Sequence, residues 1–352
     1  MKITDVTAEL VGLAAEEPAF RWRDGLPGSE PAATGVVVRV VTDEGITGEA
    51  RSRRGEIVRD LVARVIRPEL LGHDPLDREL LWQRMWDLDR REAFPVYVVG
   101  LIDIALWDLA GKIAGLPVYH LAGGFRTSIP AYASTVTYGS IAEYLDVADQ
   151  CRSAGFTAIK IHAWGDARRD IALIEALREH MGDAVPLMYD GSAGFDLPDA
   201  ITVGRALSEC GYLWYEEPMP ESSVSAYRQL AAKVDVALLV GETSSGAHNN
   251  IGDFVAVGCA PFVRTSAYYK GGITGALRIA HLADAYHLRA EVHGMGVVSE
   301  HLCMAISNNT YYESRISGNP IAVETVVDAS GHVHARTAPG LGYDLPSLAA
   351  AG

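Results

Sequence analysis

The chain has 352 residues, of which 49% are hydrophobic, and it carries a formal net charge of −15. This length exceeds one ordinary domain and fits an α/β barrel of about 250 residues plus one smaller domain. The negative charge argues against a nucleic-acid partner, because binding to a phosphate backbone requires clustered Lys and Arg.

Neither the cysteines nor the N-terminus indicates secretion or a membrane anchor. The N-terminal MKITDVTAEL contains acidic residues where a signal peptide would be apolar. The most apolar window, 94–110, is interrupted by Asp103 and Asp108, so it predicts a buried helix. Four widely spaced cysteines without a C-x-x-C pair are typical of reduced thiols in a cytoplasmic protein, which we expect here: Cys151, Cys210, Cys259 and Cys303.

The N-terminal part predicts strands followed by helices. Residues 16–31, rich in Gly, Pro and charge, read as an exposed loop. The β-branched run 34–41 and the extended run 46–50 flank a polar turn, which predicts a hairpin. From 55 to 114 the apolar residues recur at helical spacing, and this helical region ends near 121–124.

From about residue 129, short apolar runs alternate with stretches long enough for a helix. Such alternation with short connections predicts parallel strands joined by right-handed crossovers, as in a barrel or a doubly wound sheet. There is no G-x-G-x-x-G after a strand and no P-loop motif, so nucleotide-binding folds lack their signature. The expected strands lie in TAIKIH, VPLMYD, YLWYEE, VALLVGE, PFVRTS, RAEVHG and TYYES.

Polar side chains close most of these strands at a regular spacing. Successive positions differ by 28, 26, 26, 24, 27 and 20 residues, close to the length of one β/α unit. In a barrel the carboxyl ends of the strands form one ring around one mouth, where the active sites of such folds lie. We therefore predict a barrel; the strand-end residues are His162, Asp190, Glu216, Glu242, Ser266, His293 and Glu313.

Three of these positions predict a metal site. Asp190, Glu216 and Glu242 each follow an apolar strand, and three anions at one mouth repel one another unless a cation lies between them. Oxygen ligands suit Mg²⁺, or Mn²⁺, better than Zn²⁺. One such acid alone is more often a helix N-cap or a loop ion pair, but three at 26-residue intervals are not explained that way. Glu217 is adjacent to Glu216, so only one of the two can point inward.

The second and seventh strands supply candidate acid–base groups. Lys160 and His162 are two residues apart and therefore project to the same face. A lysine beside a divalent cation can have a lowered pKa, which suits proton abstraction, whereas histidine needs less tuning. His293 lies across the barrel from them, and Glu313 is placed to bond a substrate carboxylate. Capping, solvation or simple charge neutralisation would be the ordinary explanation for each of these residues taken alone.

These segments resemble the enolase superfamily, in its mandelate racemase and muconate lactonizing enzyme branch. The resemblance spans nearly the whole chain in the family's order. The matching segments are IDIALWDLAGKIAGLPVYHLAGG (102–124), AIKIH (158–162), LMYDGS (187–192), WYEEP (214–218), GET (241–243), KGGITGALRIAHLADA (270–285), EVHG (291–294), YYES (311–314) and PGLGYDL (339–345).

The resemblance implies a (β/α)₇β modified TIM barrel with an α+β capping domain built from both ends of the chain. The expected divisions are 1–125 for the capping domain, 126–320 for the catalytic barrel, and 321–352 for a tail that returns to the capping domain. It also implies that the three acids bind Mg²⁺, that His293 is a general acid/base, and that Glu313 donates a hydrogen bond to the substrate carboxylate. Because relatives commonly form dimers or octamers, a homo-oligomer is expected.

Three departures from the family pattern concern the acid–base groups. The second strand carries Lys160-Ile161-His162 in place of the usual Lys-x-Lys, so either His162 or Lys160 is the base. The sixth strand carries Ser266 where an Asp often partners the seventh-strand His, so we expect a lower pKa for His293 than in relatives with that dyad. Ser192 stands where the family usually has Asn.

Substrate contacts are expected from the capping loop and from the sixth strand. The loop 20–24 (FRWRD) would overlie the mouth, where its charged side chains suit a polar, hydroxylated substrate, diacids among them. Ordinary solvated surface is the alternative for this loop. The candidate substrate-binding residues are Trp22, Arg23, Arg264 and Ser266.

The leading hypothesis is Mg²⁺-dependent abstraction of the proton α to a carboxylate through an enediolate, leading to dehydration of an acid sugar to a 2-keto-3-deoxy acid. A racemase, epimerase or lactone cycloisomerase would use the same residues and differ in what happens on the His293 side. A barrel retained only for binding is a third hypothesis. In each case the expected partner is a small carboxylate.

Overall fold

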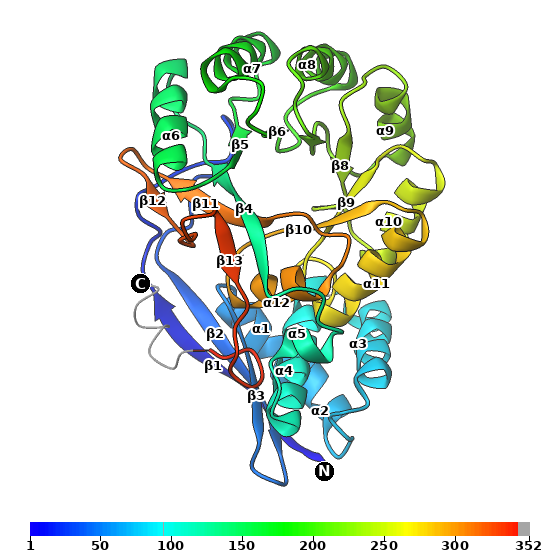
Figure 1. Ribbon diagram of the computed structural model, residues 1–352. Coiled ribbons are helices and arrows are strands. Elements are labelled where there is room, and N and C mark those ends of the chain that lie inside the picture. Colours follow the sequence, from blue (N-terminus) through cyan, green and yellow to red (C-terminus); the bar gives the residue numbers. More distant parts are fainter. Residues whose placement is uncertain (94, 344–352) are drawn as a thin grey trace.

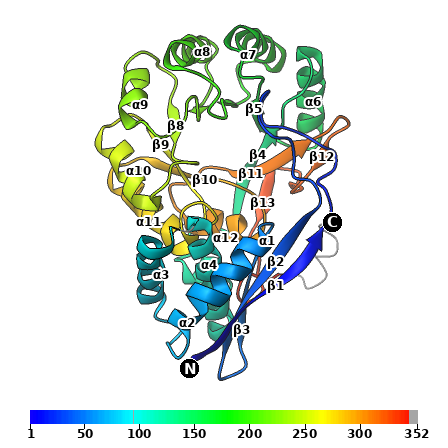
Figure 2. The same cartoon turned by 180° about the vertical axis from the view of Figure 1, so that it is seen from behind.

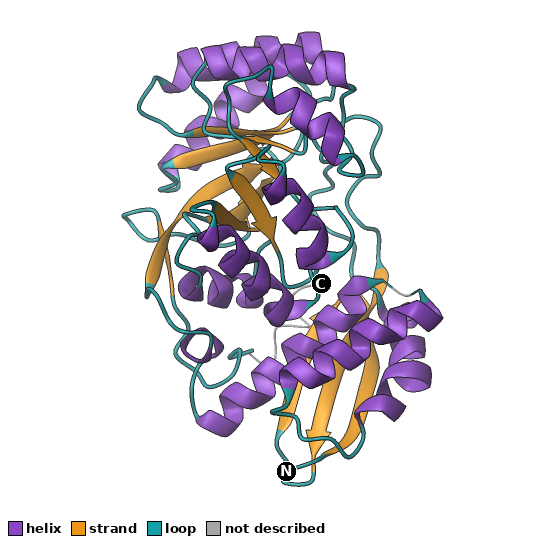
Figure 3. Cartoon of the chain, turned by 90° about the vertical axis from the view of Figure 1, so that its right-hand side faces the viewer, coloured by secondary structure: helices purple, strands orange, loops and turns teal. Residues whose placement is uncertain are grey.

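The computed structural model describes residues 1–93 and 95–343 as a capping domain joined to a barrel. Position 94 of the apolar window and positions 344–352 of the expected tail lie outside the described residues. Figure 1 shows the barrel strands above a three-stranded sheet with its own helices, and in Figure 3 the two sheets lie at opposite ends of the molecule's long axis.

The capping sheet is antiparallel, in the order β1 (Ile3–Leu13), β2 (Ala33–Thr42) and β3 (Thr47–Ser52). The predicted hairpin is therefore confirmed, because β2 and β3 are paired along their length around a tight turn. The sheet packs directly on helix α4 (Val96–Ala114), since a Cβ added at Gly48 would lie 2.0 Å from the Ala105 carbonyl oxygen.

The capping helices follow the sheet in the chain. Helix α4 is central among them, and its two acids, Asp103 and Asp108, are fully buried and hydrogen-bonded. The apolar window thus forms a buried helix as predicted, and in the described ranges no helix is long and apolar enough to cross a membrane. The remaining elements of this group are α1 (Gly55–Leu61), the π-helical turn η1 (Val62–Ile66), α2 (Arg67–Leu70), α3 (Arg78–Glu92) and α5 (Val118–Leu121).

Eight parallel strands form the barrel, and they pair in the order β10-β9-β8-β7-β6-β5-β4-β11. The two ends of this order meet where the Gly294 N–H donates to the Glu313 carboxylate at 3.0 Å. The prediction of a barrel is confirmed. The strands are β4 (Ser128–Thr135), β5 (Ala158–His162), β6 (Leu187–Asp190), β7 (Tyr215–Glu216), β8 (Leu238–Val240), β9 (Phe262–Thr265), β10 (Arg289–Val292) and β11 (Tyr312–Ser317).

Helices surround the strands on the outside, as Figure 2 shows for α6 to α9. Several begin at a residue whose side chain accepts a backbone N–H of the first turn, which explains where they start: Ser140, Asp166, Asp196 and Ser223. The helices are α6 (Ile141–Ser153), α7 (Ala167–Met181), α8 (Leu197–Glu209), α9 (Val224–Ala231), α10 (Ala247–Ala256), α11 (Gly272–Ala285) and α12 (Val297–Ala305).

The expectation that Glu313 closes the last strand is wrong. Strand β11 continues to Ser317, and Glu313 is its second residue. The extension arises because Ile316 and Ser317 pair with a further short strand, β12 (Ala322–Val323). Glu313 nevertheless faces the barrel interior, where the Ser134 hydroxyl donates to its carboxylate at 2.9 Å.

The tail runs back along the barrel to the capping domain. Strand β13 (His332–His334) pairs antiparallel with the start of β4. Further on, the Leu341 N–H donates to the buried Asp108 carboxylate at 2.8 Å, and Gly340 pairs with the segment after α4. The described part of the tail is thus anchored on the capping helices.

Candidate active site

Three carboxylates from neighbouring strand ends converge at the mouth. Asp190 ends β6, Glu216 ends β7, and Glu242 lies two residues beyond β8. One carboxylate oxygen from each lies within 4.8 Å of the others. The Asp190 and Glu216 side chains are buried and that of Glu242 is 14% exposed, so the cluster is open on the Glu242 side.

The charges of this cluster fit a cation. Burial and the neighbouring Glu217, Glu216 and Asp190 raise the pKa of Glu242 well above its usual value. Burial is the largest cause of this shift and the repulsion between the carboxylates adds to it; a divalent ion between them would offset that repulsion. The donor set is all oxygen, as hard cations such as Mg²⁺ prefer.

Lys160 occupies the centre of the carboxylates. Its ammonium lies 2.7 Å from Glu216, 2.9 Å from Glu313 and 3.1 Å from Asp190. Burial alone would lower the pKa of Lys160, but the charges of Glu216 and Glu313 raise it well above its usual value. The expectation of a lowered pKa assumed a divalent ion beside the lysine; with the carboxylates alone around it, the direction is the opposite.

His162 lies on the same side of β5 as Lys160, as the two-residue spacing predicted. Its Nδ1 is 2.7 Å from the Thr135 carbonyl oxygen, so Nδ1 carries a proton and donates it. Its Nε2 faces the cluster, 3.0 Å from the Asp190 carboxylate. The Trp22 ring packs on the imidazole with centroids 4.4 Å apart. These contacts fix both the tautomer and the orientation of His162.

His293 lies beside the third carboxylate, directly after β10. Its Nε2 is 3.1 Å from Glu242, whereas its Nδ1 is buried without a hydrogen-bond partner among the described residues. Ser266 does not replace the missing acid, because no described residue bonds His293 Nδ1; the Ser266 hydroxyl instead accepts the Tyr269 N–H at 3.4 Å. The Tyr269 ring stacks on the imidazole with centroids 5.2 Å apart. Burial is the largest cause that lowers the pKa of His293, to about 4.

Arg264 is part of the carboxylate network and is fully buried. Its guanidinium donates to both oxygens of Glu216, to the Val292 carbonyl at 3.1 Å and to the Tyr132 hydroxyl at 2.9 Å. These protein contacts use the donors that substrate binding would need. Arg264 therefore orients the Glu216 carboxylate. The sequence had instead indicated a contact between Arg264 and the substrate.

Glu217 does not belong to the cluster that its neighbour Glu216 joins. Its backbone has a φ of 37°, and its carboxylate accepts the Thr243 hydroxyl at 2.5 Å. Burial and the nearby Glu221 raise the pKa of Glu217 well above its usual value. Only Glu216 of the two adjacent acids belongs to the cluster, as strand alternation predicted.

The loop 20–24 lies against the barrel loops at the mouth. The Arg23 guanidinium donates to the Ser192 carbonyl at 2.8 Å, and the Asp24 N–H donates to the Trp164 carbonyl at 3.2 Å. Together with the contact of Trp22 on His162, these bonds attach the loop beside the first metal-ligand candidate. Its location over the mouth agrees with the expectation.

Several residues of the site were not predicted. Tyr132 and Ser134 alternate on β4 and reach Arg264 and Glu313, a signal present in the strand pattern. Tyr269 lies in an irregular loop, where no periodicity marks the direction of its ring. Its proximity to His293 depends on how β9 and β10 lie side by side, which the sequence alone does not give.

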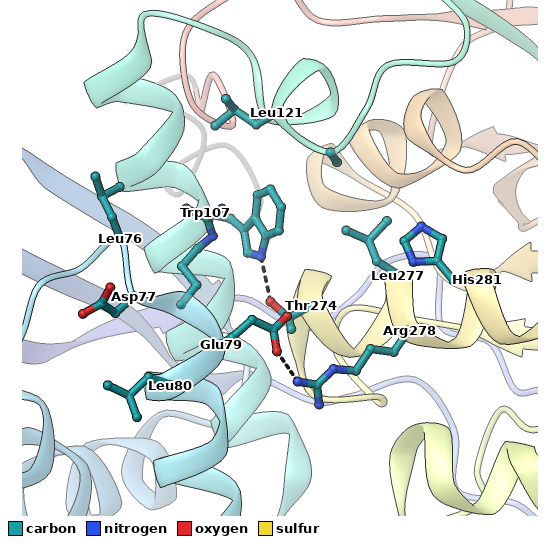
Figure 4. Close-up of a pocket in the computed structure, with 12 residues that line it drawn as sticks. Leu76, Asp77, Glu79, Leu80, Trp107, Leu121, Thr274, Leu277, Arg278 and His281 are labelled. Carbon is teal, nitrogen blue, oxygen red and sulfur yellow. Dashed lines mark hydrogen bonds and ion pairs between the residues drawn. The ribbon is translucent and has the colours of Figure 1, made fainter.

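A separate hollow of about 610 Å³ lies between the capping helices and α11 (Figure 4). Trp107 lies on its wall and donates to the Thr274 hydroxyl at 2.9 Å, and Arg278 pairs with Glu79. Its lining, as far as the chain is described, includes none of the three clustered carboxylates. This hollow lies between the capping domain and the barrel. The candidate active site is therefore the barrel mouth, where the three carboxylates cluster.

Family models and relatives agree with this arrangement. The model "Enolase C-terminal domain-like" matches residues 143–348, and "Mandelate racemase / muconate lactonizing enzyme, N-terminal domain" matches 27–123. The chain is 30% identical over 326 residues to a 3,6-anhydro-alpha-L-galactonate cycloisomerase of Streptomyces coelicolor, covering 88% of each protein.

Two solved structures are similar over nearly the whole chain. The D-glucarate dehydratase from Agrobacterium tumefaciens, complexed with magnesium, is 29% identical with a TM-score of 0.89, covering 98% of this chain and 96% of that one. The L-talarate dehydratase from Polaromonas sp., complexed with Mg and L-glucarate, is 28% identical with a TM-score of 0.82, covering 97% and 94%. The chain belongs to the enolase superfamily, in its mandelate racemase and muconate lactonizing enzyme branch.

Proposed function

We propose that this protein is a Mg²⁺-dependent dehydratase of acid sugars. The observation that carries the proposal is the convergence of Asp190, Glu216 and Glu242 within 4.8 Å, with His162 and His293 each about 3 Å from a member of that cluster. A metal flanked by two imidazoles suits removal of a proton next to a carboxylate, followed by proton delivery elsewhere on the substrate.

The three acids would hold Mg²⁺, and Mn²⁺ would fit the same oxygen donors. When bound, the ion would supply positive charge beside the substrate carboxylate, where negative charge develops as the α-proton leaves. Support comes from the raised pKa of Glu242, to which burial contributes most and the neighbouring carboxylates add. The two dehydratase structures described above contain magnesium.

His162 is the base in this proposal. The Lys160 ammonium is surrounded by three carboxylates within 3.1 Å and therefore stays charged, which suits stabilising an anion. His162 keeps its Nδ1 proton on the Thr135 carbonyl and presents Nε2 to the mouth, so Nε2 can accept the α-proton. In this proposal Lys160 exchanges one of its three carboxylate partners for the substrate carboxylate. Although burial opposes it, the charges of Lys160 and Arg264 hold the pKa of Glu313 well below its usual value, so Glu313 accepts from Lys160 and does not donate the hydrogen bond that the resemblance implied.

His293 gives a proton to the departing β-hydroxyl, which leaves as water. The imidazole is neutral at pH 7 in the free protein, because burial lowers its pKa to about 4. An anionic substrate beside His293 favours the protonated form by direct charge attraction. This requirement favours acid sugars with a second carboxylate, and the polar loop 20–24 at the mouth suits such a substrate.

A cycloisomerase is the second candidate, because the relative from Streptomyces coelicolor is named a 3,6-anhydro-alpha-L-galactonate cycloisomerase. Incubation with Mg²⁺ and a panel of acid sugars in D₂O separates the two. Dehydration yields a 2-keto-3-deoxy acid that semicarbazide detects and that is lighter than its substrate by one water, whereas isomerisation gives deuterium incorporation without loss of water. Absence of both, or of any Mg²⁺ binding, would contradict the proposed enzyme and favour a binding barrel.

A further inference from the structure

Two buried ionisable side chains, Glu221 and Lys270, bond the turn that carries Glu242. The turn spans residues 241–244, directly after β8. The Glu221 carboxylate, 4% exposed, accepts the N–H of Gly241, that of Thr243 at 2.9 Å and that of Ser244 at 3.0 Å. A carboxylate that accepts three N–H groups from one turn fixes the path of its backbone on both sides of Glu242.

Lys270 holds the same turn from the loop between β9 and α11. Its ammonium, fully buried, donates to the Ser244 carbonyl at 2.5 Å and to the Ser244 hydroxyl at 3.2 Å. Neither Glu221 nor Lys270 makes a hydrogen bond to the three candidate ligands in the described chain, yet each would be costly to bury without a partner of opposite charge. The two residues are linked through Ser244, whose N–H donates to Glu221 and whose carbonyl and hydroxyl accept from Lys270.

The turn needs such support because its backbone is unusual. Gly241 has a φ of 101°, in the region that favours glycine, and a Cβ there would lie 2.2 Å from the Ile251 side chain. The Glu242 side chain is also the most exposed of the three candidate ligands, at 14%. Its direction therefore depends on how the turn is held, more than on packing around the carboxylate.

We propose that Glu221 and Lys270 are positioning residues for Glu242, and that they set the affinity of the site for its divalent ion without touching ion or substrate. This inference rests on the proposed metal site. Removing groups that orient a metal ligand typically weakens metal binding or activity about 10–100-fold. We expect losses in that range when either charge is removed.

The test measures ion binding in full-length variants, independently of turnover. The variants are Glu221→Gln and Lys270→Met. The matched control is Lys112→Met, which also removes a lysine, but one in the capping domain, where it pairs with the buried Asp108 at 2.6 Å. Calorimetry with Mg²⁺ and electron paramagnetic resonance of Mn²⁺ give the dissociation constants. Circular dichroism reports folding.

The proposal predicts that Glu221→Gln and Lys270→Met raise the dissociation constant about 10–100-fold with unchanged circular dichroism, while Lys112→Met leaves it unchanged. Because both residues act through the same turn, the double variant should bind little worse than either single one. If both single variants bound Mg²⁺ with wild-type affinity, the positioning role would be overturned and the proposed metal site would stand. Lack of Mg²⁺ binding by the wild type would overturn the proposed metal site as well. Should Lys270→Met not fold, Glu221→Gln, which keeps the side-chain shape, decides the question.

Discussion

Replacing Lys160 with Met removes a buried positive charge from the site and leaves the three candidate metal ligands in place. The substitution removes an ammonium that contacts Glu216, Glu313 and Asp190 within 3.1 Å and leaves an apolar chain of similar length. Removing one partner of a buried ion pair costs about 3–5 kcal/mol. An unfolding entropy of about 2.1 cal/mol/K per residue gives about 0.7 kcal/mol/K for 352 residues, so the Tm should fall by about 4–7 °C in metal-free buffer.

Magnesium should reverse much of this loss, because the ion supplies the positive charge that the variant lacks. At a hundredfold excess over its Kd, a ligand of the folded state adds about 2.7 kcal/mol. Loss of the neighbouring positive charge should also tighten Mg²⁺ binding, so the rise in Tm at a fixed Mg²⁺ concentration should be larger for Lys160→Met than for the wild type. Catalysis should not recover: kcat should fall about 10²–10³-fold, as when one charge-stabilising donor is removed.

Differential scanning fluorimetry with and without Mg²⁺ measures both effects. Lys112→Met provides the control, because its partner Asp108 is buried outside the site and its stability loss should not depend on Mg²⁺. The reasoning is refuted if Lys160→Met melts like the wild type in metal-free buffer. It is equally refuted if Mg²⁺ raises the Tm of variant and wild type by the same amount.

Three further predictions follow from single contacts. Asp190→Asn should show no Mg²⁺ binding heat at concentrations that saturate the wild type, and unchanged binding would remove Asp190 from the ligand set. Tyr269→Ala should lower kcat about 2- to 12-fold, the worth of an aromatic pair, while Tyr269→Phe retains it; equal rates for the two variants would show that the stack on His293 has no role. Burial raises the pKa of Asp103 from 3.8 to about 7, so the folded protein binds more protons at this site than the unfolded one between these values, and stability falls as the pH rises from about 4 to 7. Asp103→Asn should flatten that dependence of Tm on pH, and an identical slope in the two proteins would contradict the assignment.

The strands and the three clustered acids could be predicted because each depends on local pattern. The hairpin of β2 and β3 follows from β-branched runs around a turn, and the acids recur once per β/α unit at strand ends. The same-face projection of Lys160 and His162 follows from strand alternation, and both residues contact Asp190.

Features that depend on contacts between distant segments could not be predicted. Arg264 was expected from the sequence to contact the substrate. Its guanidinium instead bonds Glu216, which lies on a strand 48 residues earlier in the chain. Glu221 and Lys270 lie in loops, where no periodicity tells which side chains turn inward. The extension of β11 beyond Glu313 arises from its pairing with β12. The homo-oligomer, the domain boundaries and the cytoplasmic location stay predictions.

A crystal structure of the protein with Mn²⁺, whose anomalous scattering locates the ion, tests the central claim most directly. One ion should lie about 2 Å from a carboxylate oxygen of Asp190, of Glu216 and of Glu242, with coordination positions left for a substrate carboxylate. An ion bound elsewhere, or one that contacts fewer than these three acids while they remain apart, would contradict the metal site and every reaction step built on it.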